Sequence, residues 1–253
     1  MFRLVQFSDT HLRTGNGRHQ RNFSRAMRRA GHCDLTVITG DLSVDGADHT
    51  RDLEAAKARF QQIKAPWKVI PGNHDIGEEP ASPRQRQPIS QIRRDRYRDV
   101  FGDDFWAEDV LGWRLVGLNV HLFGTGWAAE SRQWDMLETA IGTRACRRVG
   151  ILVHKPLFLT HADEPEDIIN CVTAPARDRI LTLMAGSEAV GFITSGHLHQ
   201  SRTHTYDGVH HIWAPATANP AGRKWAPDII QTIGFTLFDL RPNGSFRARF
   251  EFI

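Results

Sequence analysis

Apolar residues follow two patterns along this chain. Short, nearly continuous apolar runs indicate buried β-strands, and segments whose apolar residues recur every three or four positions indicate amphipathic helices. The first pattern predicts strands over residues 2–7, 35–39, 67–70, 115–120, 149–153 and 190–194. The second predicts helices near residues 21–31, 48–63, 131–141 and 176–186. Because the two kinds of element alternate, we expect a layered α/β architecture.

Two segments depart from this alternation. Residues 76–100 form a polar insertion rich in arginine, and its second half has helical periodicity. From residue 201 onward the pattern is all-β, because Asp207-Gly208 and Asn243-Gly244 each separate two strand-like runs. Both dipeptides are strong hairpin signals. No repeat or linker divides the sequence, so we expect one domain over residues 1–253, with mixed sheets and β hairpins over 201–253.

Charge narrows the range of partners only slightly. The formal net charge is +3 for 253 residues, and the calculated isoelectric point is about 9.0. Such mild basicity suits an anionic ligand but does not indicate nucleic acid. Several arginines between Arg18 and Arg29 fall on the polar face of the first predicted helix, which we interpret as a solvated surface. The sequence leaves open how many chains assemble, so a homo-oligomer remains an option.

Cysteine usage and hydropathy indicate a compartment. The three cysteines, Cys33, Cys146 and Cys171, include no close pair, so neither a disulfide framework nor a zinc knuckle is expected. No apolar stretch approaches the roughly 20 residues that cross a bilayer. The first residues lack the layout of a signal peptide. We therefore expect a cytoplasmic protein that does not bind membranes.

The residues that follow five of the predicted strands could carry chemistry. Each of these strands ends in aspartate, histidine or asparagine, and the carboxyl ends of strands in a layered α/β sheet share the edge where ligands collect. The side chains concerned are Asp9, His11, Asp41, Asn73, His74, Asp75, His154, His197 and His199. Any one of these short motifs could be a cap or a turn. Their occurrence in order, each at a strand end, favours a metal site.

The number and type of donors indicate which metals would bind. Oxygen and imidazole donors in this number are too many for one ion, whereas two divalent ions sharing one bridging carboxylate fit the count. The absence of cysteine from the set indicates Mn, Fe or Zn rather than a thiolate site. Glycines at positions 40, 72 and 196 precede the motifs, where we expect them to let the backbone turn sharply.

The ordered motifs resemble those of the calcineurin-like metallophosphoesterase superfamily. The "QFSDTHL" stretch at 6–12 and "GNHD" at 72–75 are more similar to its branch of class III cyclic-nucleotide phosphodiesterases and glycerophosphodiesterases. The resemblance implies a four-layer α-β-β-α sandwich of the metallophosphoesterase type. It also implies two metal-ligand sets that share Asp41. These are Asp9, His11, Asp41 and His199 for one ion, and Asp41, Asn73, His154 and His197 for the other.

The same resemblance implies roles for the remaining residues. His74 would contact phosphate and the leaving group, Asp75 would orient His74, and Asn73 would keep an amide donor for a phosphate oxygen. Two divalent ions about 3.5–4 Å apart can clamp a phosphate and lower the pKa of a bridging water from ~15.7 toward ~7. The resulting hydroxide would attack phosphorus while His74 assists the leaving oxygen. A phosphodiesterase acting on small diesters, such as cyclic nucleotides or glycerophosphodiesters, is therefore expected.

Other branches of the superfamily fit less well. Serine/threonine protein phosphatases carry Asp-Arg-Gly shortly after their Gly-Asp motif, whereas this chain has Val44-Asp45-Gly46. Purple acid phosphatases need a tyrosine ligand where Val44 stands. DNA break-repair nucleases share the motifs and are the alternative enzyme, but they usually carry an added DNA-capping region. A metal-free interaction module is disfavoured because no ligand is missing.

Some polar residues outside the motifs could also line the site. The insertion follows the "GNHD" stretch directly, so part of it is expected to overhang the site, although no single arginine among residues 84–98 stands out. His121, after the strand predicted over 115–120, and His161, in the loop after His154, are further candidates for the pocket wall.

Overall fold

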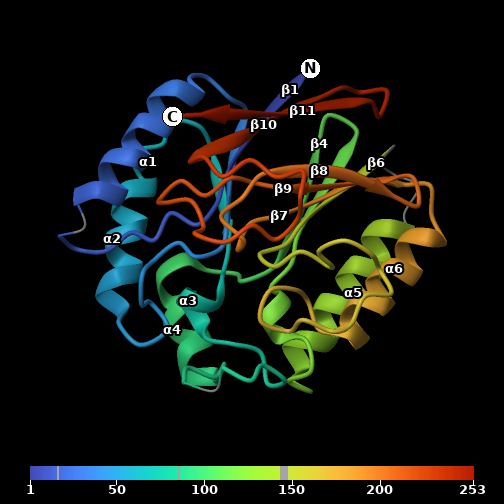
Figure 1. The fold of residues 1–253 in the computed structure, drawn as a ribbon, viewed down its shortest axis with the longest axis horizontal. Helices are drawn as coiled ribbons and strands as arrows, with labels where there is room; N and C mark the ends of the chain where they lie inside the picture. Colours follow the sequence, from blue (N-terminus) through green and yellow to red (C-terminus); the bar gives the residue numbers. More distant parts are fainter. Residues whose placement is uncertain (16, 85, 143–147) are drawn as a thin grey trace.

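Two mixed β-sheets stacked face to face form the centre of the protein, in a computed structural model that describes residues 1–253 except 16, 85 and 143–147. The five-stranded sheet has the order β11-β10-β1-β2-β3, and the six-stranded sheet has the order β4-β5-β6-β7-β9-β8. Helices α1 and α2 lie outside the first sheet, and α5 and α6 lie outside the second (Figure 1). The expected four-layer α-β-β-α sandwich is confirmed.

The elements have the following bounds. The strands are β1 (Phe2–Phe7), β2 (Leu35–Thr39), β3 (Trp67–Ile70), β4 (Trp106–Val110), β5 (Trp113–Gly117), β6 (Arg148–Leu152), β7 (Val190–Ser195), β8 (Arg202–Tyr206), β9 (Val209–Trp213), β10 (Gly234–Leu240) and β11 (Phe246–Phe252). The helices are α1 (Gly17–Ala30), α2 (Thr50–Phe60), α3 (Asn73–Ile76), α4 (Gln91–Phe101), α5 (Ala128–Gly142) and α6 (Ala174–Ala185), with the 3-10 turn η1 (Val120–Leu122).

The alternation of side chains along β1 explains why the two sheets pack together. Val5 and Phe7 point to the core beneath α1 and α2, whereas Leu4 points to the core between the sheets. Gln6 also faces the second sheet, where its side chain accepts from Thr194 of β7 (2.7 Å), and it donates to Thr39 of the neighbouring β2 (2.9 Å). Each buried strand therefore contributes to two cores, as its continuous apolar pattern requires.

The structure confirms most of the predicted elements, including both C-terminal hairpins. The strand expected over 115–120 instead ends at Gly117, because the Asn119 side chain accepts from the His121 amide (3.1 Å) and begins the turn η1. The edge strand β4 was not predicted, since its residues are alternately exposed and only half-buried. A strand of this kind has a weak apolar pattern.

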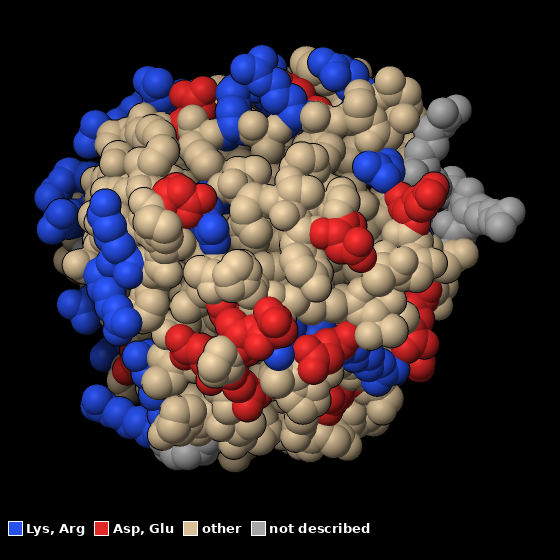
Figure 2. Space-filling view, turned by 45° about the vertical axis from the view of Figure 1, so that its right-hand side comes forward, with Lys and Arg blue, Asp and Glu red and all other residues tan. Residues whose placement is uncertain are grey.

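Three predictions, on cysteines, membrane-spanning helices and the arginine-rich helix face, can be compared with the structure. Cys33 and Cys171 are buried free thiols, and Cys146 lies outside the described residues. In the described ranges, no helix has the length and apolar character needed to span a membrane. Lys and Arg side chains line the left edge of the view in Figure 2, on the same side as α1 and α2 in Figure 1. The exposed arginines of α1 agree with the solvated face expected there.

A pair of histidines crosses the β8–β9 hairpin. His204 and His211 are register partners with ring centroids 5.1 Å apart, and Phe158 lies 4.8 Å from His211. Burial, with the nearby His204, lowers the pKa of His211 to about 3. The unfolded chain therefore binds a proton at this residue near pH 6.5 that the folded chain does not bind. The free energy of unfolding should fall as the pH decreases below that value.

We expect His211→Phe to reduce this acid sensitivity, because phenylalanine keeps a ring against Phe158 and cannot be protonated. Between pH 6.5 and 5, wild-type protein should lose ~2 kcal/mol more free energy of unfolding than the variant, measured by urea denaturation in EDTA. His32→Gln alters an exposed histidine outside the hairpin and should behave like wild type. Parallel pH profiles for wild type and His211→Phe would show that the imidazole is not held neutral.

Candidate metal centre

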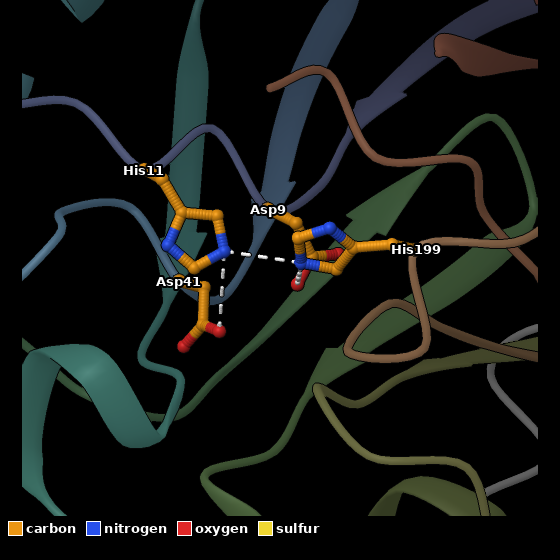
Figure 3. Close-up of side chains that lie close together, drawn as sticks. All are labelled: Asp9, His11, Asp41 and His199. Carbon is orange, nitrogen blue, oxygen red and sulfur yellow. Dashed lines mark hydrogen bonds and ion pairs between the residues drawn. The ribbon is translucent and has the colours of Figure 1, made fainter. Parts of the chain in front are cut away.

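Loops at the carboxyl ends of β1, β2 and β7 bring together a first group of donors. Asp9, His11, Asp41 and His199 place their ligand atoms within 4.8 Å of one another (Figure 3). His11 Nε2 lies 3.6 Å from Asp41 Oδ2, and His199 Nε2 lies 3.5 Å from Asp9 Oδ1. This is the first ligand set that the sequence motifs implied.

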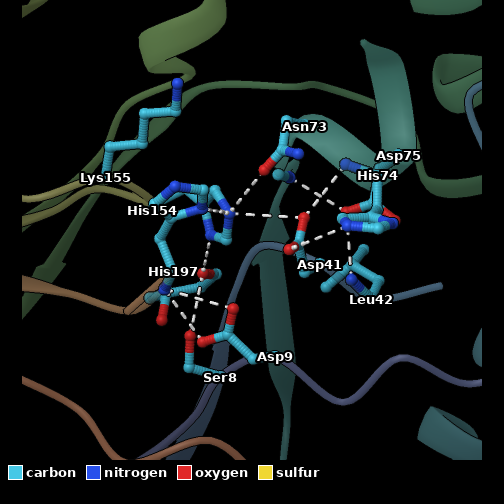
Figure 4. A network of polar contacts seen from close by, with 12 residues as sticks. Ser8, Asp9, Asp41, Leu42, Asn73, His74, Asp75, His154, Lys155 and His197 are labelled. Carbon is cyan, nitrogen blue, oxygen red and sulfur yellow. Dashed lines mark hydrogen bonds and ion pairs between the residues drawn. The ribbon is translucent and has the colours of Figure 1, made fainter. Parts of the chain in front are cut away.

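A second group lies beside the first and includes the same aspartate. Ligand atoms of Asp41, His154 and His197 fall within 4.8 Å of one another, and His154 Nε2 is 3.3 Å from Asp41 Oδ1 (Figure 4). The amide oxygen of Asn73 is also 3.3 Å from His154 Nε2. Asp41 thus turns one carboxylate oxygen to each group, which is the geometry of a bridging ligand.

Backbone carbonyls fix the orientation of the imidazoles. His154 Nδ1 lies 2.9 Å from the Thr39 carbonyl oxygen, and His199 Nδ1 lies 2.7 Å from that of Asn219. Since a carbonyl only accepts, each of these nitrogens carries a proton, and the other ring nitrogen faces the cluster. Such partners are typical of metal-binding histidines.

Two pairs of imidazole nitrogens lie close together, as expected for ligands of a cation. His11 Nε2 is 3.1 Å from His199 Nε2, and His197 Nδ1 is 3.2 Å from His154 Nε2. Lone pairs at these distances repel unless a proton or a metal ion lies near them. Oxygen and imidazole donors without thiolate suit Mn, Fe or Zn. The donor set therefore fits two divalent ions.

Two carboxylates of the cluster are ionised at neutral pH. Burial raises the pKa of Asp9, but the adjacent His199 and His154 outweigh it and lower the pKa to about 2. For Asp41 the same opposition between burial and nearby imidazoles, His154 first among them, leaves the pKa well below its usual value. Both groups are thus in the deprotonated form that metal binding requires.

Glycines allow the loops to approach the ligands closely. A Cβ atom on Gly196 would lie 1.8 Å from Ser8 Oγ and 2.5 Å from Asp9 Oδ2, and one on Gly72 would lie 2.2 Å from Asp41 Oδ1. The expectation that all three glycines make sharp turns is therefore wrong for these two. Of the three, only Gly40 has a positive φ, of 83°. Gly72 and Gly196 are needed because a side chain would occupy the donors' space.

The strained backbone conformations belong to the donors themselves. Most non-glycine residues with positive φ in the described chain are in the cluster, with φ between 41° and 66°. They are Asp9, His11, Asp41, His197 and His199. Left-handed backbone costs an ordinary residue about 1–2 kcal/mol, and such strain concentrates at functional sites. The strained backbone of these residues lowers local stability and directs their side chains toward the cluster.

The hydrogen bonds of Asp75 go to loop amides and a hydroxyl, while its charge contributes to raising the pKa of His74, so its expected role in orienting His74 stays a prediction. Its carboxylate accepts from the Leu42 amide (3.0 Å), the Ser43 amide (2.9 Å) and hydroxyl (2.6 Å), and the Gly72 amide (2.9 Å). These bonds tie the loop after β2 to the loop after β3. Burial, together with the charge of Asp41, raises the pKa of Asp75 to about 6. The carboxylate of Asp75 therefore connects the two loops that carry Asp41 and His74.

His74 is held by a different group. Its Nδ1 lies 2.6 Å from the Val44 carbonyl oxygen, while its Nε2 is 4.0 Å from Asp41 Oδ2. The negative charge of Asp41 raises the pKa of His74, burial opposes this, and the hydrogen bond to Val44 adds to it. Asn73 donates from Nδ2 to Glu78 (3.1 Å), so one of its two amide protons is already used.

A cavity of about 420 Å³ lies over the donors. Among the insertion arginines, Arg84 lines it, whereas Arg93 and Arg94 pair with Asp48 and Asp104. The insertion therefore overhangs the site, as expected. His121 is fully buried against Glu79 (2.9 Å) and does not line the cavity, and neither does His161. Further lining residues that no motif had indicated are His19, Asn170, Asn219 and Trp225.

Comparison with known proteins gives a family match and more distant individual similarities. The family model described as calcineurin-like phosphoesterase matches residues 2–201. A probable cyclic nucleotide phosphodiesterase of Synechococcus is 24% identical over 87% of this chain and 77% of its own length. The serine/threonine-protein phosphatase CPPED1 of Bos taurus is 28% identical over 67% of this chain and 54% of its own.

A solved structure confirms the fold. The purple acid phosphatase PPD1 from yellow lupin superposes with a TM-score of 0.72 at 14% identity. The similarity covers 99% of this chain but 51% of the lupin protein. At this identity the likeness concerns architecture alone, and Val44 still stands where the tyrosine ligand of purple acid phosphatases was sought.

Proposed function

The chain belongs to the calcineurin-like phosphoesterase family, and we propose that it is a dinuclear metal-dependent phosphodiesterase acting on small diesters, such as cyclic nucleotides or glycerophosphodiesters. The observation that carries the proposal is the position of Asp41, whose two oxygens face two separate groups of donors. The similarity to a probable cyclic nucleotide phosphodiesterase supports the choice of a diester.

The two groups divide the ligands between two ions of Mn, Fe or Zn. Asp9, His11, Asp41 and His199 would hold one, and Asp41, Asn73, His154 and His197 would hold the other. Two divalent ions that share a carboxylate clamp a phosphate and activate water for attack on phosphorus. The remaining N–H of Asn73 is the proposed donor to a phosphate oxygen.

His74 would supply the proton for the leaving oxygen. Its Nδ1–H is committed to the Val44 carbonyl, so Nε2 is the nitrogen that can carry and release a second proton. The charge of Asp41, opposed by burial, raises the pKa of His74. Imidazole, whose unperturbed pKa lies near neutral pH, is well suited to this task. Asp75 would support catalysis through the loops that it joins and through its charge beside His74.

The cavity suits a small substrate. Pockets for small ligands span roughly 300–1,000 Å³, and this one lies at the lower end of that range. Arg84 offers a cation on the wall, where it would bind an anionic group of the substrate. A nuclease would need a longer track of phosphate contacts. The proposed substrate therefore contains one or two nucleotide-sized units.

A phosphomonoesterase is the second candidate, because the similarity to CPPED1 concerns a protein named as a phosphatase. The test is a substrate panel with manganese-reconstituted protein. We expect kcat/KM for bis(p-nitrophenyl) phosphate to exceed that for p-nitrophenyl phosphate by at least roughly tenfold, together with turnover of a cyclic nucleotide or a glycerophosphodiester. Faster monoester hydrolysis would favour the phosphatase. Cleavage of duplex DNA at about 0.15 M salt without turnover of small diesters would favour the nuclease.

His74→Ala should discriminate between leaving groups. An alkoxide needs protonation as it leaves, whereas nitrophenolate leaves unaided, and general acid catalysis contributes typically about 10²–10⁴-fold. We therefore expect the variant to lose activity of that order on an alkyl diester and much less on bis(p-nitrophenyl) phosphate. Metal content, measured by elemental analysis, should be unchanged. Equal losses on both substrates would assign His74 to binding instead.

A further inference from the structure

A buried cluster of charged side chains adjoins the second group of donors. Lys155 follows the donor His154 directly, and its side chain is fully buried. Its ammonium nitrogen lies 2.6 Å from Glu79 Oε1, 3.3 Å from Glu78 Oε2 and 2.8 Å from the Ile168 carbonyl oxygen. Figure 4 shows this side chain extending from the backbone beside His154. A fully buried ammonium ion is stable only where carboxylate or carbonyl partners lie within hydrogen-bond distance.

One arm of this cluster reaches Asn73. Glu78 accepts a hydrogen bond from Asn73 Nδ2 (3.1 Å) through Oε1 and contacts Lys155 through Oε2. The hydrogen bond from Nδ2 determines which way the Asn73 amide faces, so that its oxygen points to His154. Lys155 thus holds Glu78, and Glu78 holds Asn73 in the orientation of an oxygen ligand.

A second arm reaches His197. The Ile168 carbonyl accepts from Lys155, and the next carbonyl along, that of Ile169, lies 2.8 Å from His197 Nε2. The anchored loop therefore supplies the oxygen that keeps the proton on Nε2 and leaves Nδ1 facing the cluster. His199, in the first group of donors, is held elsewhere, by the Asn219 carbonyl.

The cluster is not a third metal site. Glu78, Glu79 and His121 do have ligand atoms within 4.8 Å of one another. The Lys155 ammonium, however, already contacts both carboxylates and supplies the cation that they need. Burial raises the pKa of Glu79, but His121 and Lys155 together lower it to about 2, so this carboxylate is charged at neutral pH.

We propose that Lys155 is a positioning residue that orients Asn73 and His197 and so determines the affinity of one of the two metal ions. This inference rests on the dinuclear centre of the proposed function. Through Glu78 and the loop at Ile168, Lys155 holds Asn73 and His197, which are both ligands of the second group. Replacing Lys155 should therefore lower the affinity for one ion and not for the other.

The experiment is a Mn²⁺ titration of chelator-stripped protein by calorimetry, with bound metal counted by elemental analysis. Wild type should bind two ions. In Lys155→Met the affinity for one ion should fall by roughly 10–100-fold, as is typical when the partner of a metal ligand is removed. The affinity for the other ion should stay unchanged. Glu78→Gln keeps the volume of the side chain and should cause the same selective loss, because an amide cannot accept from Asn73 and Lys155 at once.

Arg94→Met is the matched control. Arg94 and Asp104 form another buried ion pair (2.7 Å), which contacts none of the proposed metal ligands. This variant should lower the melting temperature and leave both affinities as in wild type. The proposal is overturned if Lys155→Met and Glu78→Gln behave like the control, or if they weaken both ions equally. Fewer than two ions on wild-type protein would overturn the dinuclear centre itself, and this inference with it.

Discussion

The sharing of one buried carboxylate between two sets of donors is the constraint on which the rest of the site depends. Asp41 must remain ionised while almost fully buried, and an anion in such a place is stable only beside positive charge. Imidazoles surround it on both sides, and the amide of His74 donates to Oδ1 (3.0 Å). Two bound cations would complete this neutralisation. The buried negative charge of Asp41 therefore favours the binding of the two divalent cations proposed for the site.

The two stacked sheets make this arrangement possible. Loops that follow β1, β2 and β3 in one sheet meet loops that follow β6 and β7 in the other, so donors distant in sequence converge at one edge. Gly72 and Gly196 let the loops come close enough, and Asp75 joins two of them through backbone amides. Several donors have left-handed backbone conformations in this arrangement. The adjoining strands and the hydrogen bonds between loops stabilise these strained conformations.

Much of the fold could be predicted because it depends on local pattern. Buried strands such as Leu35–Thr39 are uniformly apolar, and Asp207-Gly208 specifies a hairpin whatever surrounds it. The donors could be found because each follows a strand directly. In contrast, the amides that donate to Asp75 belong to two loops, and the local sequence of neither loop predicts that the two meet. The same holds for Lys155, because its carboxylate partners Glu78 and Glu79 lie 77 and 76 residues away in the sequence and only the folded chain brings them together.

The central claim is that two metal ions share Asp41. An anomalous-difference map from crystals of manganese-loaded protein, collected near the manganese absorption edge, tests it most directly. We expect two peaks about 3.5–4 Å apart, one on each side of the Asp41 carboxylate. A single peak, or peaks that do not contact Asp41, would contradict it.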